Sequence, residues 1–207
     1  MSVHCCPPAP VASNVSPAYR RVLWVALAAN ALMFVVEAGA GAAAGSAALL
    51  ADAADFFGDA VNYGASLAAL VAGGLWVSRV ALAKGWVMGA YGIGVLALTG
   101  WNAWHGVLPE PVTMGAIGLL ALAVNIGVAL LLYRYRNGDA NMRSVWLCTR
   151  NDAIGNLAVL LAALGVFGTG TAWPDWIVAA LMAALALQAS VSVIRAARRE
   201  LLTPALR

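Results

Sequence analysis

Long apolar runs alternate with short polar breaks along the whole chain. Runs of about 20 residues or more match the length that an α-helix needs to cross a bilayer. The pattern predicts six such helices, at residues 21–43, 46–73, 80–104, 112–133, 144–168 and 174–196. The first break, "GAAAGS", carries only small residues, but Ser46 is a residue type that commonly begins a helix. We therefore expect an all-α membrane protein with six transmembrane helices.

The composition supports this interpretation. The chain has 207 residues, of which 63% are hydrophobic and only 10% are charged, and its mean hydropathy is +0.84. Soluble domains are typically about half apolar and a quarter charged, so a soluble globular protein is excluded. Six spans take up residues 20–196, which leaves no room for a separate soluble domain.

The two ends of the chain are expected to be tails. Residues 1–19 are polar and rich in proline, and the apolar run that follows is long enough to span a membrane. A cleavable signal peptide has the opposite arrangement, with a short apolar core after its positive charges. We expect a flexible cytoplasmic tail there and a short basic cytoplasmic tail at residues 197–207.

The basic residues predict the orientation. In a six-helix arrangement all of them fall on the side that holds both termini, and Lys and Arg are retained on the cytoplasmic side. They are Arg20, Arg21, Arg79, Lys84, Arg134, Arg136, Arg143, Arg150, Arg195, Arg198, Arg199 and Arg207. Both termini are thus expected to be cytoplasmic, in the cell (inner) membrane. The net charge of +3 then reflects topology, and a nucleic-acid partner is not expected.

Acidic residues lie within the predicted spans, where an uncompensated charge is costly. Asp52, Asp55 and Asp59 have no Lys, Arg or His within fifteen residues on either side. Their i, i+3, i+7 spacing puts all three on one face of a helix. Glu37 in the first span and Asp152 in the fifth are also acidic.

Two pairs in this set have the spacing of metal ligands. Asp55 and Asp59 are four residues apart, as are Cys148 and Asp152, so each pair lies on one helix face. Four such ligands from two facing helices can form a tetrahedral site, which Zn²⁺ prefers. A thiol in the set favours Zn²⁺ or a softer ion such as Cd²⁺ over Mg²⁺ or Ca²⁺, which bind oxygen ligands.

The remaining candidates have alternative interpretations. Asp52 is either a supporting residue near the site, a proton carrier or a packing group, and Glu37 is expected to make a supporting contact between helices. Cys148 taken alone resembles a small buried hydrophobe. The cluster His4, Cys5 and Cys6 either captures soft metal ions or is incidental. The odd number of cysteines does not indicate a disulfide framework.

The sequence resembles the cation diffusion facilitator family of zinc-type efflux transporters. The resemblance rests on "NALMFVVEAGAGAAAGSAALLADAADFFGDAVN" at residues 30–62 and on "CTRNDAIGNLAVLLA" at residues 148–162. It implies metal ligands at Asp55, Asp59, Cys148 and Asp152, and metal–proton exchange by alternating access in a homodimer. The position of Cys148 often holds His in the family. The His-rich cytoplasmic loop and the cytoplasmic domain that commonly follows the sixth helix are not found here, so this resembles a short form.

We therefore expect a divalent-cation efflux transporter rather than an enzyme, with Zn²⁺ or Cd²⁺ as transported substrate and no tightly bound cofactor. A metal-binding membrane accessory or sensor without transport activity is the alternative. An intramembrane aspartyl protease is disfavoured, because "FFGDA" lacks the Gly-x-Gly-Asp context of such enzymes.

Overall fold

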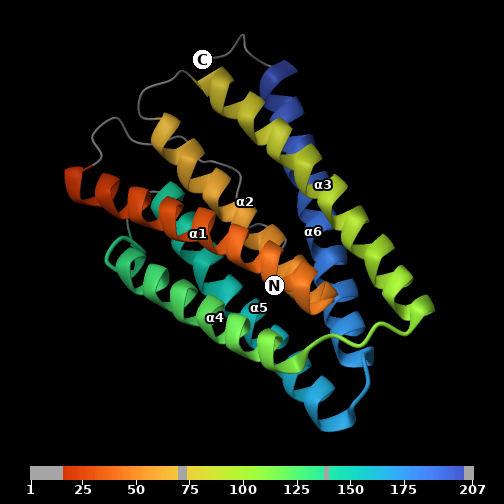
Figure 1. Ribbon diagram of the computed structural model, residues 1–207. Coiled ribbons are helices and arrows are strands. Elements are labelled where there is room, and N and C mark those ends of the chain that lie inside the picture. The colour runs from red at the N-terminus through yellow and green to blue at the C-terminus, as the bar shows by residue number, and fades with distance from the viewer. Residues whose placement is uncertain (1–15, 70–73, 138–139, 203–207) are drawn as a thin grey trace.

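The computed structural model describes residues 16–69, 74–137 and 140–202, which fold into six α-helices without a strand (Figure 1). This confirms the predicted all-α class and the number of helices. The helices are α1 (Pro17–Ala44), α2 (Ala47–Ala69), α3 (Gly74–His105), α4 (Pro111–Tyr133), α5 (Ala140–Thr169) and α6 (Trp173–Leu202).

Five of the six helices are long and apolar enough to cross a membrane, and α2 is the exception among the described residues. Its three aspartates, Asp52, Asp55 and Asp59, lie within eight positions of one another and lower its hydropathy throughout. The chain is an integral, multi-pass membrane protein. The carboxylates that set α2 apart are the ones from which the metal site is predicted.

Several helices extend beyond their apolar runs. Helix α3 begins at Gly74 instead of residue 80, and α6 continues to Leu202 through residues that the sequence pattern assigns to a tail. Both extensions contain arginines, which are good helix formers although they are not apolar. Hydropathy identifies only the part of a helix that contacts lipid. The apolar run is therefore shorter than the helix.

The helices form two groups. Helices α1, α2, α4 and α5 lie together, while α3 and α6 form a long pair beside them (Figure 1). Helix α2 contacts α1 and α5 in its own group, and it also contacts both α3 and α6. Helix α5 also contacts α6, so the two groups meet through α2 and α5.

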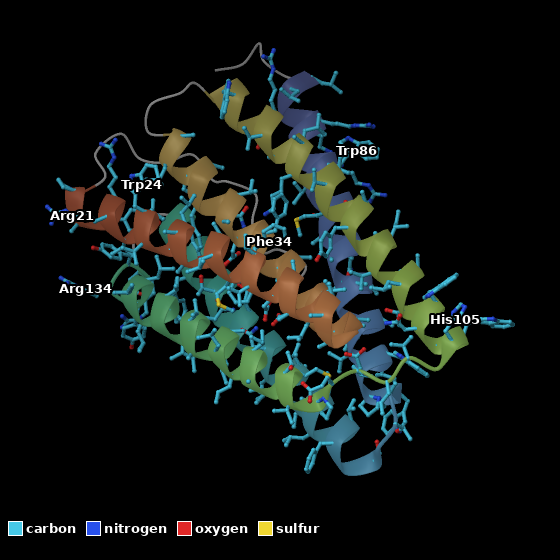
Figure 2. All side chains as sticks on the ribbon, in the orientation of Figure 1. Arg21, Trp24, Phe34, Trp86, His105 and Arg134 are labelled. Carbon is cyan, nitrogen blue, oxygen red and sulfur yellow. The ribbon has the colours of Figure 1, made fainter. Side chains whose placement is uncertain are left out.

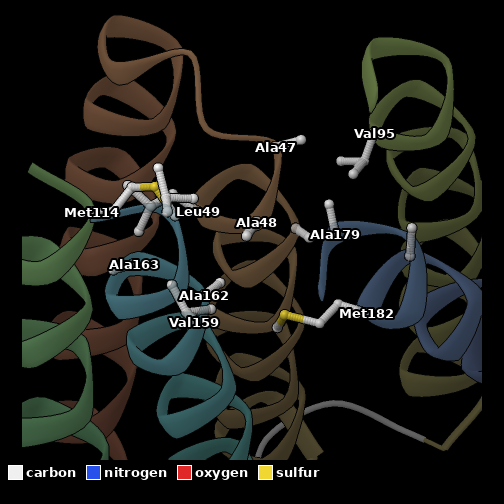
Figure 3. Packing of buried hydrophobic residues seen from close by; sticks show 13 residues of the cluster. Ala47, Ala48, Leu49, Val95, Met114, Val159, Ala162, Ala163, Ala179 and Met182 are labelled. Carbon is white, nitrogen blue, oxygen red and sulfur yellow. The ribbon is translucent and has the colours of Figure 1, made fainter. Parts of the chain in front are cut away.

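Large and small side chains are distributed as expected for a protein surrounded by lipid. The buried cluster that joins α2, α5 and α6 consists mostly of alanine, for example Ala48, Ala162 and Ala179 (Figure 3). Large apolar residues point outward instead: Leu32 is 65% exposed and Leu164 is 67% exposed. Small residues allow helices to approach closely where lipid removes the hydrophobic drive to associate.

Three turns at one end of the molecule each contain a glycine with positive φ. Gly45, Gly106 and Gly170 each have φ near +65°, a left-handed conformation that glycine adopts without the strain of a Cβ. The turns at Gly45 and Gly106 are connected, because Asn102 Nδ2 donates to the Gly45 carbonyl (3.2 Å) and the Glu110 N–H donates to the Ala44 carbonyl (2.9 Å). His105 lies at this end, whereas Arg21 and Arg134 lie at the other (Figure 2).

Asp175 of α6 caps the first turn of α2. Its carboxylate accepts hydrogen bonds from Ser46 Oγ (2.6 Å), the Ala47 N–H (3.0 Å) and the Ala48 N–H (3.1 Å). Ser46 Oγ accepts in turn from the Leu49 N–H (3.1 Å), as expected for the residue that begins a helix. The Asp175 carboxylate satisfies otherwise unpaired donors and lies at the positive end of the α2 dipole.

Glu110 plays the same part for α4, but at the surface. Its carboxylate accepts from the backbone N–H groups of Val112 (3.0 Å) and Thr113 (2.6 Å). Hydrogen bonds from Thr113 and then from Val112 lower the pKa of the Glu110 carboxyl.

We expect Asp175→Ala to lower the free energy of unfolding by about 2 kcal/mol, because it removes a charged acceptor from a buried helix start. Denaturant titration of the detergent-solubilised protein measures this change. Asp175→Asn, which keeps one acceptor oxygen, should lose less, and so should Glu110→Ala at the exposed cap. Equal losses for Asp175→Ala and Glu110→Ala would contradict the assignment of Asp175 as a buried cap.

Close packing of α3 on α6 depends on glycines of α3. A Cβ at Gly85 would lie 2.7 Å from Ile194 Cγ1, and one at Gly89 would lie 2.7 Å from Ser190 Oγ. Ser190 Oγ also donates to the Gly85 carbonyl (2.7 Å). A larger residue at either position would have to displace the side chain of Ile194 or Ser190.

Gly85→Ala is therefore expected to reduce stability by about 1–3 kcal/mol through overpacking. Gly94→Ala on the same helix is the matched control, since nothing lies within 4 Å of a Cβ at Gly94. The control should unfold at the same denaturant concentration as the wild type or at a slightly higher one. If Gly94→Ala lost as much stability as Gly85→Ala, the loss could not be attributed to the contact between α3 and α6.

Candidate metal centre

The structure brings together carboxylates from two helices that are distant in sequence. Asp59 of α2 is buried, and its carboxyl group lies within hydrogen-bonding reach of that of Asp152 on α5. Asp55 lies one turn before Asp59, close enough for the two charges to interact. Helices α2 and α5 pack against each other, which is why Asp59 and Asp152 lie close together.

The fourth predicted ligand, Cys148, precedes Asp152 by one helical turn on α5. Its side chain lies outside the described part of the structure, as do His4, Cys5 and Cys6. Within the described part, no three His, Cys, Asp or Glu side chains are placed so that they could share one ion. Coordination by Cys148 therefore stays a prediction.

A lysine reaches these carboxylates from α3. Lys84 is only 7% exposed, and its Nζ donates to Asn62 Oδ1 on α2 at 2.5 Å. Its charge acts most strongly on Asp59, then on Asp152 and Asp55. The sequence pattern assigns Lys84 to the cytoplasmic edge by its position near the second loop, but the side chain points into the helix bundle.

Asp59 is also positioned by an aromatic hydroxyl. Tyr63 lies one turn after Asp59 on α2, and its hydroxyl donates to Asp59 Oδ2 (3.0 Å). The same hydroxyl lies 2.6 Å from Thr149 Oγ1 on α5. A phenol has one proton, so when Tyr63 donates to Asp59 the Thr149 hydroxyl must be the donor of the second bond. This chain links the two helices beside the carboxylates.

A second polar cluster lies further along α2, toward its capped end. Asn156 Nδ2 donates to Asp52 Oδ2, and Asn125 Nδ2 of α4 donates to Asn156 Oδ1 (2.7 Å). The carboxyl group of Glu37 on α1 lies beside that of Asp52. These polar contacts join four helices, and a supporting role of Asp52 and Glu37 at the site stays a prediction.

Glu37 is fully buried, and no N–H or O–H donor reaches either of its carboxylate oxygens among the described residues. Its neighbour Asp52 is itself an acceptor when ionised. A proton held between the two carboxyl groups is the donor that would satisfy both.

The arrangement places carboxylate groups from α2 and α5 close to each other within the bundle. The polar groups that support it are Asn62, Tyr63, Lys84 and Thr149. Sequence spacing on single helices does not reveal them, except that Tyr63 follows Asp59 by four residues and so shares its face.

Comparison with known protein families gives a match over the second part of the chain. The family model of the cation efflux transmembrane domain matches residues 80–202, which is more than half of the chain and includes α5 with Asp152. No curated protein matches the chain.

Proposed function

The chain belongs to the cation efflux family and is a cation transporter, and from this premise we propose that it exports Zn²⁺ in exchange for protons. Cd²⁺ or another soft dication is the nearest alternative substrate. The single observation that supports the proposal most is the meeting of Asp59 and Asp152 inside the helix bundle. We further propose that it works as a homodimer in the cell (inner) membrane, with both termini cytoplasmic.

The choice of Zn²⁺ depends on the donor set. Asp55, Asp59 and Asp152 supply carboxylate oxygens, and Cys148 adds a soft thiolate if its side chain turns toward them. Zn²⁺ accepts this mixture in tetrahedral geometry, whereas Mg²⁺ retains an octahedral shell of oxygens. The small, mostly carboxylate site is suited to one ion at a time.

Exchange for protons follows from the chemistry of the ligands. Carboxylates and thiolates bind a metal only after they lose their protons, so metal binding releases protons. In a state open to the cytoplasm the ligands take the metal. When the site faces outward, protons compete for the same groups and displace it. One site then suffices to couple the two fluxes.

The test is transport into liposomes. Purified wild-type protein with an imposed pH gradient should move Zn²⁺, and the double variant Asp59→Ala, Asp152→Ala should reduce the flux to that of protein-free liposomes. Glu110→Ala, which removes a carboxylate at the surface, is the control and should transport like the wild type. Undiminished flux in the double variant would refute the proposed site. Zn²⁺ binding without flux in the wild type would favour the accessory protein instead.

The role of Cys148 is tested by Cys148→His. If the thiol is a ligand, replacing it by the harder imidazole should shift the preference from Cd²⁺ toward Zn²⁺. The measurement is the ratio of Cd²⁺ to Zn²⁺ transport rates under the same gradient, with Cys148→Ala for comparison. An unchanged ratio in both variants would mean that Cys148 only packs against its neighbours.

A further inference from the structure

We propose that the ammonium group of Lys84 is the resident counter-cation of the carboxylate site and that a metal ion must displace it in order to bind. The inference rests on the proposed metal site and assigns Lys84 a role in setting its affinity. It explains how α2 can carry several carboxylates inside the bundle when no metal is present.

The first argument is the position of the lysine. Its Nζ donates to Asn62 Oδ1, one turn beyond Asp59 on α2. Its Cε lies 3.7 Å from the place where a Cβ of Gly58 would be, so the side chain runs along α2 beside Gly58. The ammonium is thereby directed at α2, at the level of Asp59.

The second argument is its charge. An ammonium has three N–H donors, and the Asn62 oxygen takes one of them. Burial of an ammonium is tolerated only where anions and hydrogen-bond acceptors compensate it. The anions that act on Lys84 are Asp59, Asp152 and Asp55, which are the carboxylates proposed as metal ligands.

The third argument is that two cations cannot share these carboxylates. An ammonium and a dication placed beside the same carboxylates repel each other strongly in surroundings of low polarity. Metal binding is then an exchange, in which the lysine gives up the carboxylates to the metal and returns when the metal leaves. Lys84 weakens the apparent affinity for metal, and it speeds release by offering the carboxylates a replacement cation.

The experiment compares Lys84→Met with the wild type. We expect the dissociation constant for Zn²⁺, measured by competition with a chelating dye on detergent-solubilised protein, to fall by about tenfold or more. In liposomes both KM and kcat should fall, because the metal binds more tightly and leaves more slowly. Arg79→Met, which removes an exposed cation from the same helix, should leave both quantities unchanged.

Two further variants keep the outcome decisive. Lys84→Arg retains the charge and should bind Zn²⁺ like the wild type. Should Lys84→Met fail to fold, Lys84→Gln replaces it, since Gln keeps a donor for Asn62 and lacks the charge. Unchanged or weaker Zn²⁺ binding in a folded, uncharged variant would overturn the proposed role of Lys84 but not the proposed function. Absence of Zn²⁺ binding and transport in the wild type would instead overturn the proposed function, and with it this inference.

Discussion

The need to compensate buried carboxylates governs much of this structure. A bare carboxylate inside a helix bundle in lipid is costly, because neither water nor mobile ions are available to solvate it. The protein compensates the carboxylates on and around α2 in different ways. Asp175 accepts hydrogen bonds at the N-terminus of α2, Asp52 accepts one from Asn156, and Asp59 accepts one from Tyr63 and lies near the charge of Lys84. Each solution recruits a group from another helix, and together they fix the position of α2.

The remaining packing follows from this arrangement. Helix α2 must lie in the middle, within reach of α1, α5, α3 and α6, so that all of these partners can contribute. Such close contact requires small side chains, and alanine and glycine dominate the interior accordingly. The larger apolar side chains that would fill the core of a soluble protein point toward the lipid instead.

The sequence was sufficient to predict the helices and to select Asp55, Asp59 and Asp152 as candidate ligands. Periodicity within a helix placed Asp55 and Asp59 on one face, and apolar length gave six helices with one uncertain boundary at Gly45. Spacing along one chain segment cannot reveal what a different helix supplies. Lys84 was therefore interpreted from its neighbourhood in sequence, beside Arg79, as a residue of the cytoplasmic edge. Lys84 differs from Arg79 in its position, which is about one and a half turns further into the apolar run. An ionisable residue within such a run is functional by default.

Asp175 shows the same limit at the other end of α2. It lies in the first turn of α6 among Trp and Pro residues, a context typical of a membrane interface. The residues that it caps come more than 120 positions earlier in the chain. Only the fold reveals this contact.

That contact also constrains how the molecule can move. Asp175 fastens α6 to the beginning of α2, and the neighbouring turns are joined by the bonds of Asn102 and Glu110. Separation of the α3–α6 pair from the other four helices at this end must first break the charged bonds to Asp175. Separation at the opposite end leaves them intact. The hydrogen bonds of Asp175 therefore oppose opening at the glycine-turn end without opposing it at the other end.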